Sequence, residues 1–116
     1  RAHMLKERMD ILQQASVISQ EVSDYVKQVI DLLEPSFSEK ESGMEMFTTH
    51  LAMATQRIIN QDEVEQLDEA IWNDVLKSPC YDLAEQTFIT IEEMAPCKFP
   101  EGEKRFLMMH LCNLHQ

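Results

Sequence analysis

Two histidines could carry chemistry in this chain, because each lies in an apolar helical stripe with a charged residue seven positions away. Arg57 follows His50, and Glu103 precedes His110. Seven residues make two helical turns, so each pair shares one helix face, with its members roughly 10 Å apart along the axis. An imidazole can act as a nucleophile, bind a metal ion or form hydrogen bonds at the edge of a core. The spacing alone does not choose among these three roles.

A metal site and a purely structural role are the alternatives to nucleophilic chemistry. His50, His110 and Glu103 would form a metal site if their helices met inside a bundle. The chain lacks the Glu-x-x-His pairs of di-iron bundles, and its three cysteines show no Cys-x-x-Cys spacing. We therefore expect no metal ion and no cofactor. In a non-catalytic helical bundle that only binds other proteins, both histidines would be structural.

The composition favours a single all-α domain. The chain has 116 residues, of which 44% are hydrophobic and 27% charged, with only two glycines and four prolines. So few breakers leave little room for a turn-rich β fold, and the length suits one domain. The net charge of −11 argues against nucleic-acid binding, since phosphate contacts need clustered Lys and Arg. No apolar run approaches the roughly 18 residues of a membrane span.

Helical periodicity divides the chain into about five helices. Apolar residues recur at helical spacing from about Leu5 to Leu33, and Pro35 is predicted to end that helix. The part before Ser16 is either a separate short helix or a frayed start. Further helices are predicted near residues 44–58, 64–76, 79–94 and 103–115. The joints between them are short, so neighbouring helices should be antiparallel and form a compact bundle.

Two of the helix starts are predicted from local capping signals. Asp62 and Glu65 form a candidate capping box before the helix at 64–76. Ser78 followed by Pro79 is typical of a cap and a first helical position, so the next helix should begin there. The inward face of that helix is expected to carry Leu83, Ala84, Phe88, Ile91 and Met94.

The two histidine segments resemble the two histidine motifs of the phosphotransferase-system regulation domain, the PRD. The first motif of that family is a histidine, a hydrophobic stretch and an arginine seven residues later, which HLAMATQR at residues 50–57 matches. The second is a glutamate, an aromatic residue and a histidine followed by Leu or Ile. In EKRFLMMHL, at residues 103–111, Glu103, Phe106, His110 and Leu111 match in order. The resemblance runs from Ile18 to Leu114.

The resemblance implies an all-helical domain that receives phosphate and is not an enzyme. In PRDs the histidines accept phosphate from the histidine carrier protein HPr or from an enzyme II B component, so His50 and His110 are the candidate phosphoacceptors. The phosphoryl group would add roughly two negative charges. Arg57 could pair with its oxygens, and Glu103 could hold His110 through one ring N–H. The family often has an acidic residue before the first histidine, where this chain has Thr49.

The resemblance also implies context. PRDs generally act as homodimers whose repacking controls transcription or antitermination. They usually occur in pairs joined to a nucleic-acid-binding module, so this chain is either cut from a larger regulator or a stand-alone domain. The first residues, RAHM, read as a cloning scar of residues 1–3 before a native Met4, which leaves residues 4–116 as one PRD-like domain. Unpaired cysteines and the phosphotransferase context favour a bacterial cytoplasm.

Overall fold

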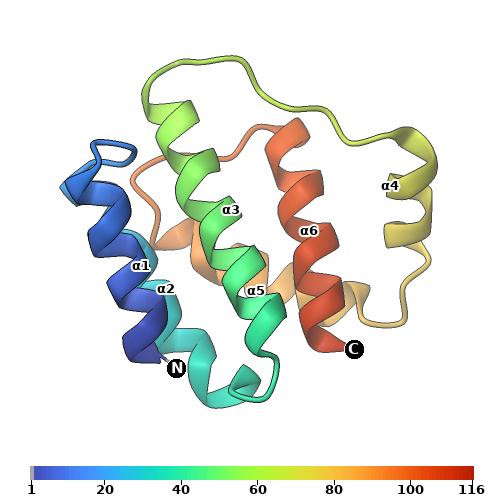
Figure 1. Cartoon of the computed structure of the whole chain (residues 1–116). Coiled ribbons are helices and arrows are strands. Elements are labelled where there is room, and N and C mark those ends of the chain that lie inside the picture. The colour runs from blue at the N-terminus through green and yellow to red at the C-terminus, as the bar shows by residue number, and fades with distance from the viewer. Residues whose placement is uncertain (1) are drawn as a thin grey trace.

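Six α-helices make up the bundle in the computed structural model, which describes residues 2–116. The prediction of an all-helical bundle is confirmed, and the predicted number of five main helices is one too low (Figure 1). The helices are α1 (Ala2–Gln14), α2 (Gln20–Phe37), α3 (Glu41–Ile59), α4 (Glu69–Leu76), α5 (Tyr81–Glu93) and α6 (Glu101–His115).

The additional helix is α1, which is separate from α2 because a residue with a left-handed backbone conformation follows it. Ser16 has a φ of 62°. Ser19 then begins α2, since its hydroxyl oxygen accepts a hydrogen bond from the Val22 N–H at 3.2 Å. Leu5 and Met9, one turn apart on α1, are buried against the rest of the bundle. These two side chains fix which face of α1 points inward.

Pro35 does not end α2, which continues to Phe37. A proline this close to a helix end removes only one backbone hydrogen bond. Phe37 is buried and packs edge-on against the His115 ring, with the ring centroids 4.9 Å apart. This apolar contact holds the last turn in place beyond the proline.

The third predicted helix begins later than its capping box suggested. Residues 62–68 are irregular, and α4 begins at Glu69, capped by the Asp68 carboxylate, which accepts from the Ala70 N–H at 3.1 Å. The irregular segment crosses the start of α6 at Gly102, where an added Cβ would lie 2.7 Å from the Glu65 carbonyl oxygen. Glycine permits this close backbone approach.

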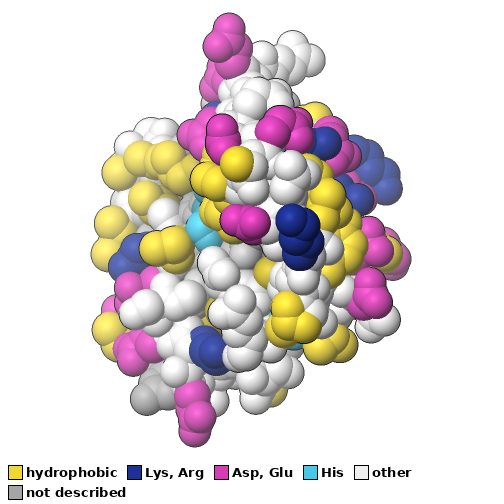
Figure 2. Space-filling model, turned by 90° about the vertical axis from the view of Figure 1, so that its right-hand side faces the viewer, with side chains coloured by type: hydrophobic (Ala, Val, Ile, Leu, Met, Phe, Trp, Pro, Cys, Tyr) yellow, Lys and Arg dark blue, Asp and Glu magenta, His cyan; other side chains and the backbone are white. Residues whose placement is uncertain are grey.

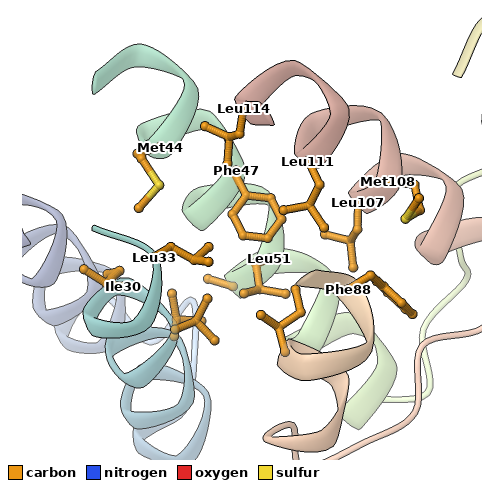
Figure 3. Packing of buried hydrophobic residues seen from close by; sticks show 14 of the residues in the cluster. Ile30, Leu33, Met44, Phe47, Leu51, Phe88, Leu107, Met108, Leu111 and Leu114 are labelled. Atoms are coloured by element: carbon orange, nitrogen blue, oxygen red, sulfur yellow. The ribbon is translucent and has the colours of Figure 1, made fainter. Parts of the chain in front are cut away.

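The core lies where α2, α3, α5 and α6 meet. The side chains in Figure 3 come from all four helices and point toward one another. Phe47, Leu51, Phe88, Leu107 and Leu111 are almost completely buried. Leu83 was predicted to point inward, but it is 53% exposed, because α5 presents that face to solvent while Ala84, Phe88 and Ile91 are buried.

The packing of α6 on α3 positions the candidate site. α6 runs antiparallel to α3 and lies directly beside it (Figure 1), although more than forty residues separate the two helices in the sequence. On the side of the molecule where α4 lies, acidic and apolar side chains are interspersed over the surface (Figure 2). Among the described helices, none has the length and apolar character needed to cross a membrane.

Candidate functional site

The candidate site lies along the contact between α3 and α6. Because the helices are antiparallel, seven residues forward on α3 correspond to seven residues backward on α6. His50 therefore faces His110, and Arg57 faces Glu103. The two matching seven-residue spacings in the sequence are the two sides of one interhelical contact.

Glu103 and Arg57 form a bidentate ion pair between the helices. The Arg57 Nε–H donates to Glu103 Oε2 at 3.0 Å, and Arg57 Nη2 donates to Oε1 at 3.2 Å. The Glu103 side chain is 0% exposed, whereas that of Arg57 is 24% exposed. The guanidinium thus covers a carboxylate that has no access to water of its own.

The ion pair with Arg57 helps to lower the pKa of Glu103. Burial raises the pKa, but interactions with His50 and Arg57 outweigh that effect and hold the pKa below the ordinary value for glutamate. His50 Nε2 lies 3.7 Å from Glu103 Oε1, within reach of an ion pair but too far for a hydrogen bond. The carboxylate is therefore charged at neutral pH and is held mainly by Arg57.

The two imidazoles lie against each other. The ring centroids of His50 and His110 are 5.2 Å apart, and the ring planes are inclined by 50°. Phe106, one turn before His110, also packs near the His50 ring, with a centroid distance of 5.4 Å. His50 Nε2 is buried and has no hydrogen-bond partner within the described part of the chain. A histidine with a purely structural role normally has such a nitrogen satisfied.

His110 remains neutral over the physiological range. Burial lowers its pKa to about 4, and the neighbouring His50 contributes in the same direction. A neutral imidazole has one ring nitrogen with a free lone pair, so His110 is in the nucleophilic form near pH 7.

Both histidines line an open pocket of about 540 Å³. Its other lining residues come from α1 and α3: Arg8, Ser42, Glu45, Met46, Thr49, Met53 and Arg57. The Arg8 guanidinium donates a hydrogen bond to the Thr49 hydroxyl at 3.2 Å and lies 3.7 Å from a Glu45 carboxylate oxygen. The pocket therefore joins two imidazoles and two guanidinium groups in a chain whose net charge is −11.

All four residues singled out from the sequence, His50, Arg57, Glu103 and His110, meet at this site. The suggested hold of Glu103 on His110 is wrong, because Glu103 reaches across to Arg57 and His50 of α3. Two turns of α6 separate Glu103 from His110, which is too far for a hydrogen bond. Within residues 2–116, no group of three or more His, Cys, Asp or Glu side chains is arranged to hold a metal ion.

The sequence did not predict that Arg8 lines the pocket. The segment before Ser16 was read as either a short helix or a frayed start, and neither reading indicates what it packs against. Leu5, Met9 and Leu12 follow the i, i+4, i+7 spacing of one helix face, which is a signal that could have shown α1 to be packed. Even so, that spacing does not reveal that α1 packs beside α3.

The arrangement defines a class of protein: an all-helical bundle with two histidines from distant segments at one surface pocket. The family model described as PRD domain matches residues 23–114. The match covers most of the chain, so the protein belongs to the PRD family, whose members are regulatory domains controlled by the phosphotransferase system. Neither the comparison with curated proteins nor that with solved structures finds a match.

Proposed function

We propose that this domain receives phosphoryl groups from the bacterial sugar phosphotransferase system on His50 and His110. The observation that supports this most is the juxtaposition of the two imidazoles, 5.2 Å apart, at one open pocket. A phosphoryl donor needs a neutral imidazole that it can reach from solvent. His110 meets both needs, because its pKa is about 4 and its ring lines the pocket.

The reaction is a transfer between two histidines. The donor is a phosphohistidine of HPr or of an enzyme II B component. The phosphorus–nitrogen bond of the donor breaks and a phosphorus–nitrogen bond to His50 or His110 forms, while the donor nitrogen recovers its lone pair. No redox change and no metal-bound step is involved. This domain contributes the acceptor nitrogen and the charges around it, so its role is that of a substrate and receiver.

The consequence of phosphorylation is electrostatic. A phosphoryl group on His50 would bring roughly two negative charges close to the Glu103 carboxylate, which lies 3.7 Å from His50 Nε2. The two histidines are so close that a group on one raises the cost of adding a group to the other. The contact between α3 and α6 is therefore sensitive to phosphorylation, and a change there would alter packing between subunits of a homodimer.

The output we propose is control of transcription or antitermination in the cytoplasm, through rearrangement of that homodimer or through a protein partner. This domain itself has too negative a charge to serve as the nucleic-acid-binding part. A bundle with purely structural histidines is the rival. The unsatisfied Nε2 of His50 speaks against it, because a structural histidine should have both nitrogens satisfied or solvated.

The test is phosphoryl transfer in vitro. Labelled phosphoenolpyruvate, enzyme I and HPr, with enzyme II B components in parallel reactions, should label the wild-type chain with an acid-labile, alkali-stable group. His50→Ala and His110→Ala should each reduce the label, and the double variant should abolish it. A folded wild-type protein that takes no label from any donor would refute the proposal.

A further inference from the structure

We propose that Arg8 of α1 is the phosphoryl-binding residue of the histidine pocket, while Arg57 stays bound to Glu103. This inference rests on the proposed function, because it names the group that recognises the phosphoryl oxygens once they are transferred. Its ligand is a phosphoryl group attached to a histidine of the same chain.

Arg57 is poorly suited to the task, although its spacing from His50 suggested it. Its Nε and Nη2 both donate to Glu103. If Arg57 turned to a phosphoryl group, it would leave a carboxylate that is 0% exposed without its main partner. An unpaired buried charge is strongly unfavourable, so Arg57 is committed to its present position.

Arg8 has the opposite properties. Its side chain is 44% exposed, and its two polar contacts are weak: one hydrogen bond to a neutral hydroxyl and one ion-pair distance of 3.7 Å. Thr49, which receives that hydrogen bond, directly precedes His50. Arg8 therefore lines the same pocket as the two acceptor histidines, and it can exchange its present partners for a dianion at little cost.

The position of Arg8 is built into the fold. Leu5 and Met9 anchor α1 in the core, and Arg8 lies on the adjoining face toward α3. α1 precedes residue 23, where the family match begins. Arg8 thus lies in a segment that the family model does not cover.

Glu45 is the competing group. Its carboxylate lines the same pocket and is the anion that Arg8 now faces. An arriving phosphoryl group must displace Glu45 from Arg8 and is repelled by it. Arg8 and Glu45 should therefore have opposite effects on phosphate acceptance, which a merely structural ion pair would not produce.

The experiment uses potassium phosphoramidate as the donor, because a small donor removes any effect of Arg8 on the docking of a donor protein. The phosphorus–nitrogen bond of phosphoramidate breaks, the bond to imidazole forms, and ammonia leaves. We compare wild type, Arg8→Gln, Glu45→Gln and the control Lys6→Gln by 31P NMR. Lys6 is on the same helix, carries the same charge and pairs with Asp31, away from the pocket.

The expected result is that Arg8→Gln slows labelling and shortens the lifetime of the phosphohistidine by about fivefold to tenfold, as for loss of one partly exposed charged hydrogen bond. Glu45→Gln should accelerate labelling, and Lys6→Gln should match wild type. The 31P signal of the phosphohistidine should shift in Arg8→Gln but not in Lys6→Gln.

Three results would overturn the inference. If the wild type is labelled and Arg8→Gln behaves like Lys6→Gln, Arg8 does not bind the group, although the proposed function stands. If labelling is slowed to the same extent in Arg8→Gln and Glu45→Gln, the ion pair between Arg8 and Glu45 is only structural. A wild type that takes no label from phosphoramidate or from the protein donors refutes the proposed function, and the role of Arg8 with it.

Discussion

Replacing Arg57 with methionine tests whether the buried ion pair holds α3 to α6. Methionine keeps the length and the apolar stem but leaves the Glu103 carboxylate, which is 0% exposed, without its bidentate partner. Breaking a buried pair from one side costs about 3–5 kcal/mol. His50 Nε2 remains 3.7 Å away and offsets part of the loss, so we expect about 3 kcal/mol. In a domain of this size, that lowers Tm by roughly 10–15 °C.

The loss should depend on pH in a defined direction. In wild type the pKa of Glu103 lies below its ordinary value, so the ion pair stabilises the fold at neutral pH and is lost as pH falls through the folded-state pKa. In Arg57→Met, only the interaction with His50 still opposes burial, so we expect the pKa of Glu103 to rise above its unfolded value. The free-energy cost of burying the charged Glu103 carboxylate is absent in acid, where the carboxyl group is protonated, and grows as pH rises. The difference in Tm between the two proteins should therefore be largest near pH 7 and should shrink below about pH 4.

The assay is thermal unfolding followed by circular dichroism at both pH values, with a double-mutant cycle. Glu103→Gln alone should cost about 1 kcal/mol, because Arg57 is partly exposed and keeps access to water. The double variant should cost about 2 kcal/mol less than the two single effects added together. Equal losses of Tm at both pH values, or additive effects in the cycle, would refute the assignment of this pair as a buried, coupled contact.

Three further predictions concern neighbouring features. Because the pKa of His110 is about 4, its imidazole should titrate near that value by NMR. The fold should lose stability as pH falls from about 6.5, where the unfolded chain gains the proton, and His110→Asn should remove this pH-dependent loss of stability. A titration of His110 near pH 6.5 would contradict the prediction. Gly102→Ala should destabilise the fold by about 1–3 kcal/mol in thermal unfolding, since its Cβ would meet the Glu65 backbone oxygen at 2.7 Å; the control Gly43→Ala meets only the movable end of Leu114 and should cost less. Tyr25→Phe should cost about 1 kcal/mol in the same assay, because it removes a buried hydrogen bond of 2.7 Å to the Ile91 carbonyl oxygen; an unchanged Tm would contradict that value.

The sequence predicted the type and approximate position of most helices, because apolar periodicity is a local property. It misplaced boundaries where contacts between distant segments decide them. Phe37 stays helical past Pro35 because it packs on His115, and residues 62–68 are not helical where they cross α6 at Gly102. No periodicity within either segment carries that information.

The candidate site was predictable in its residues but not in its contacts. The two seven-residue spacings indicated the right side chains, and the family motifs agreed with them. Which groups meet depends on α3 and α6 being antiparallel neighbours, which follows from packing of the whole bundle. For that reason Glu103 was matched with His110 on its own helix and not with Arg57, and Arg8 was not considered.

The most direct test of the account is a count of the phosphoryl groups on each histidine after phosphorylation by phosphoenolpyruvate, enzyme I and HPr or an enzyme II B component. Intact-mass measurement of wild type, His50→Ala and His110→Ala, with peptide mapping at alkaline pH, assigns the group. Phosphohistidine is expected only at residues 50 and 110, and none is expected in the variant that lacks both histidines. Label that persists in the double variant, or none on folded wild type with every donor, would contradict it.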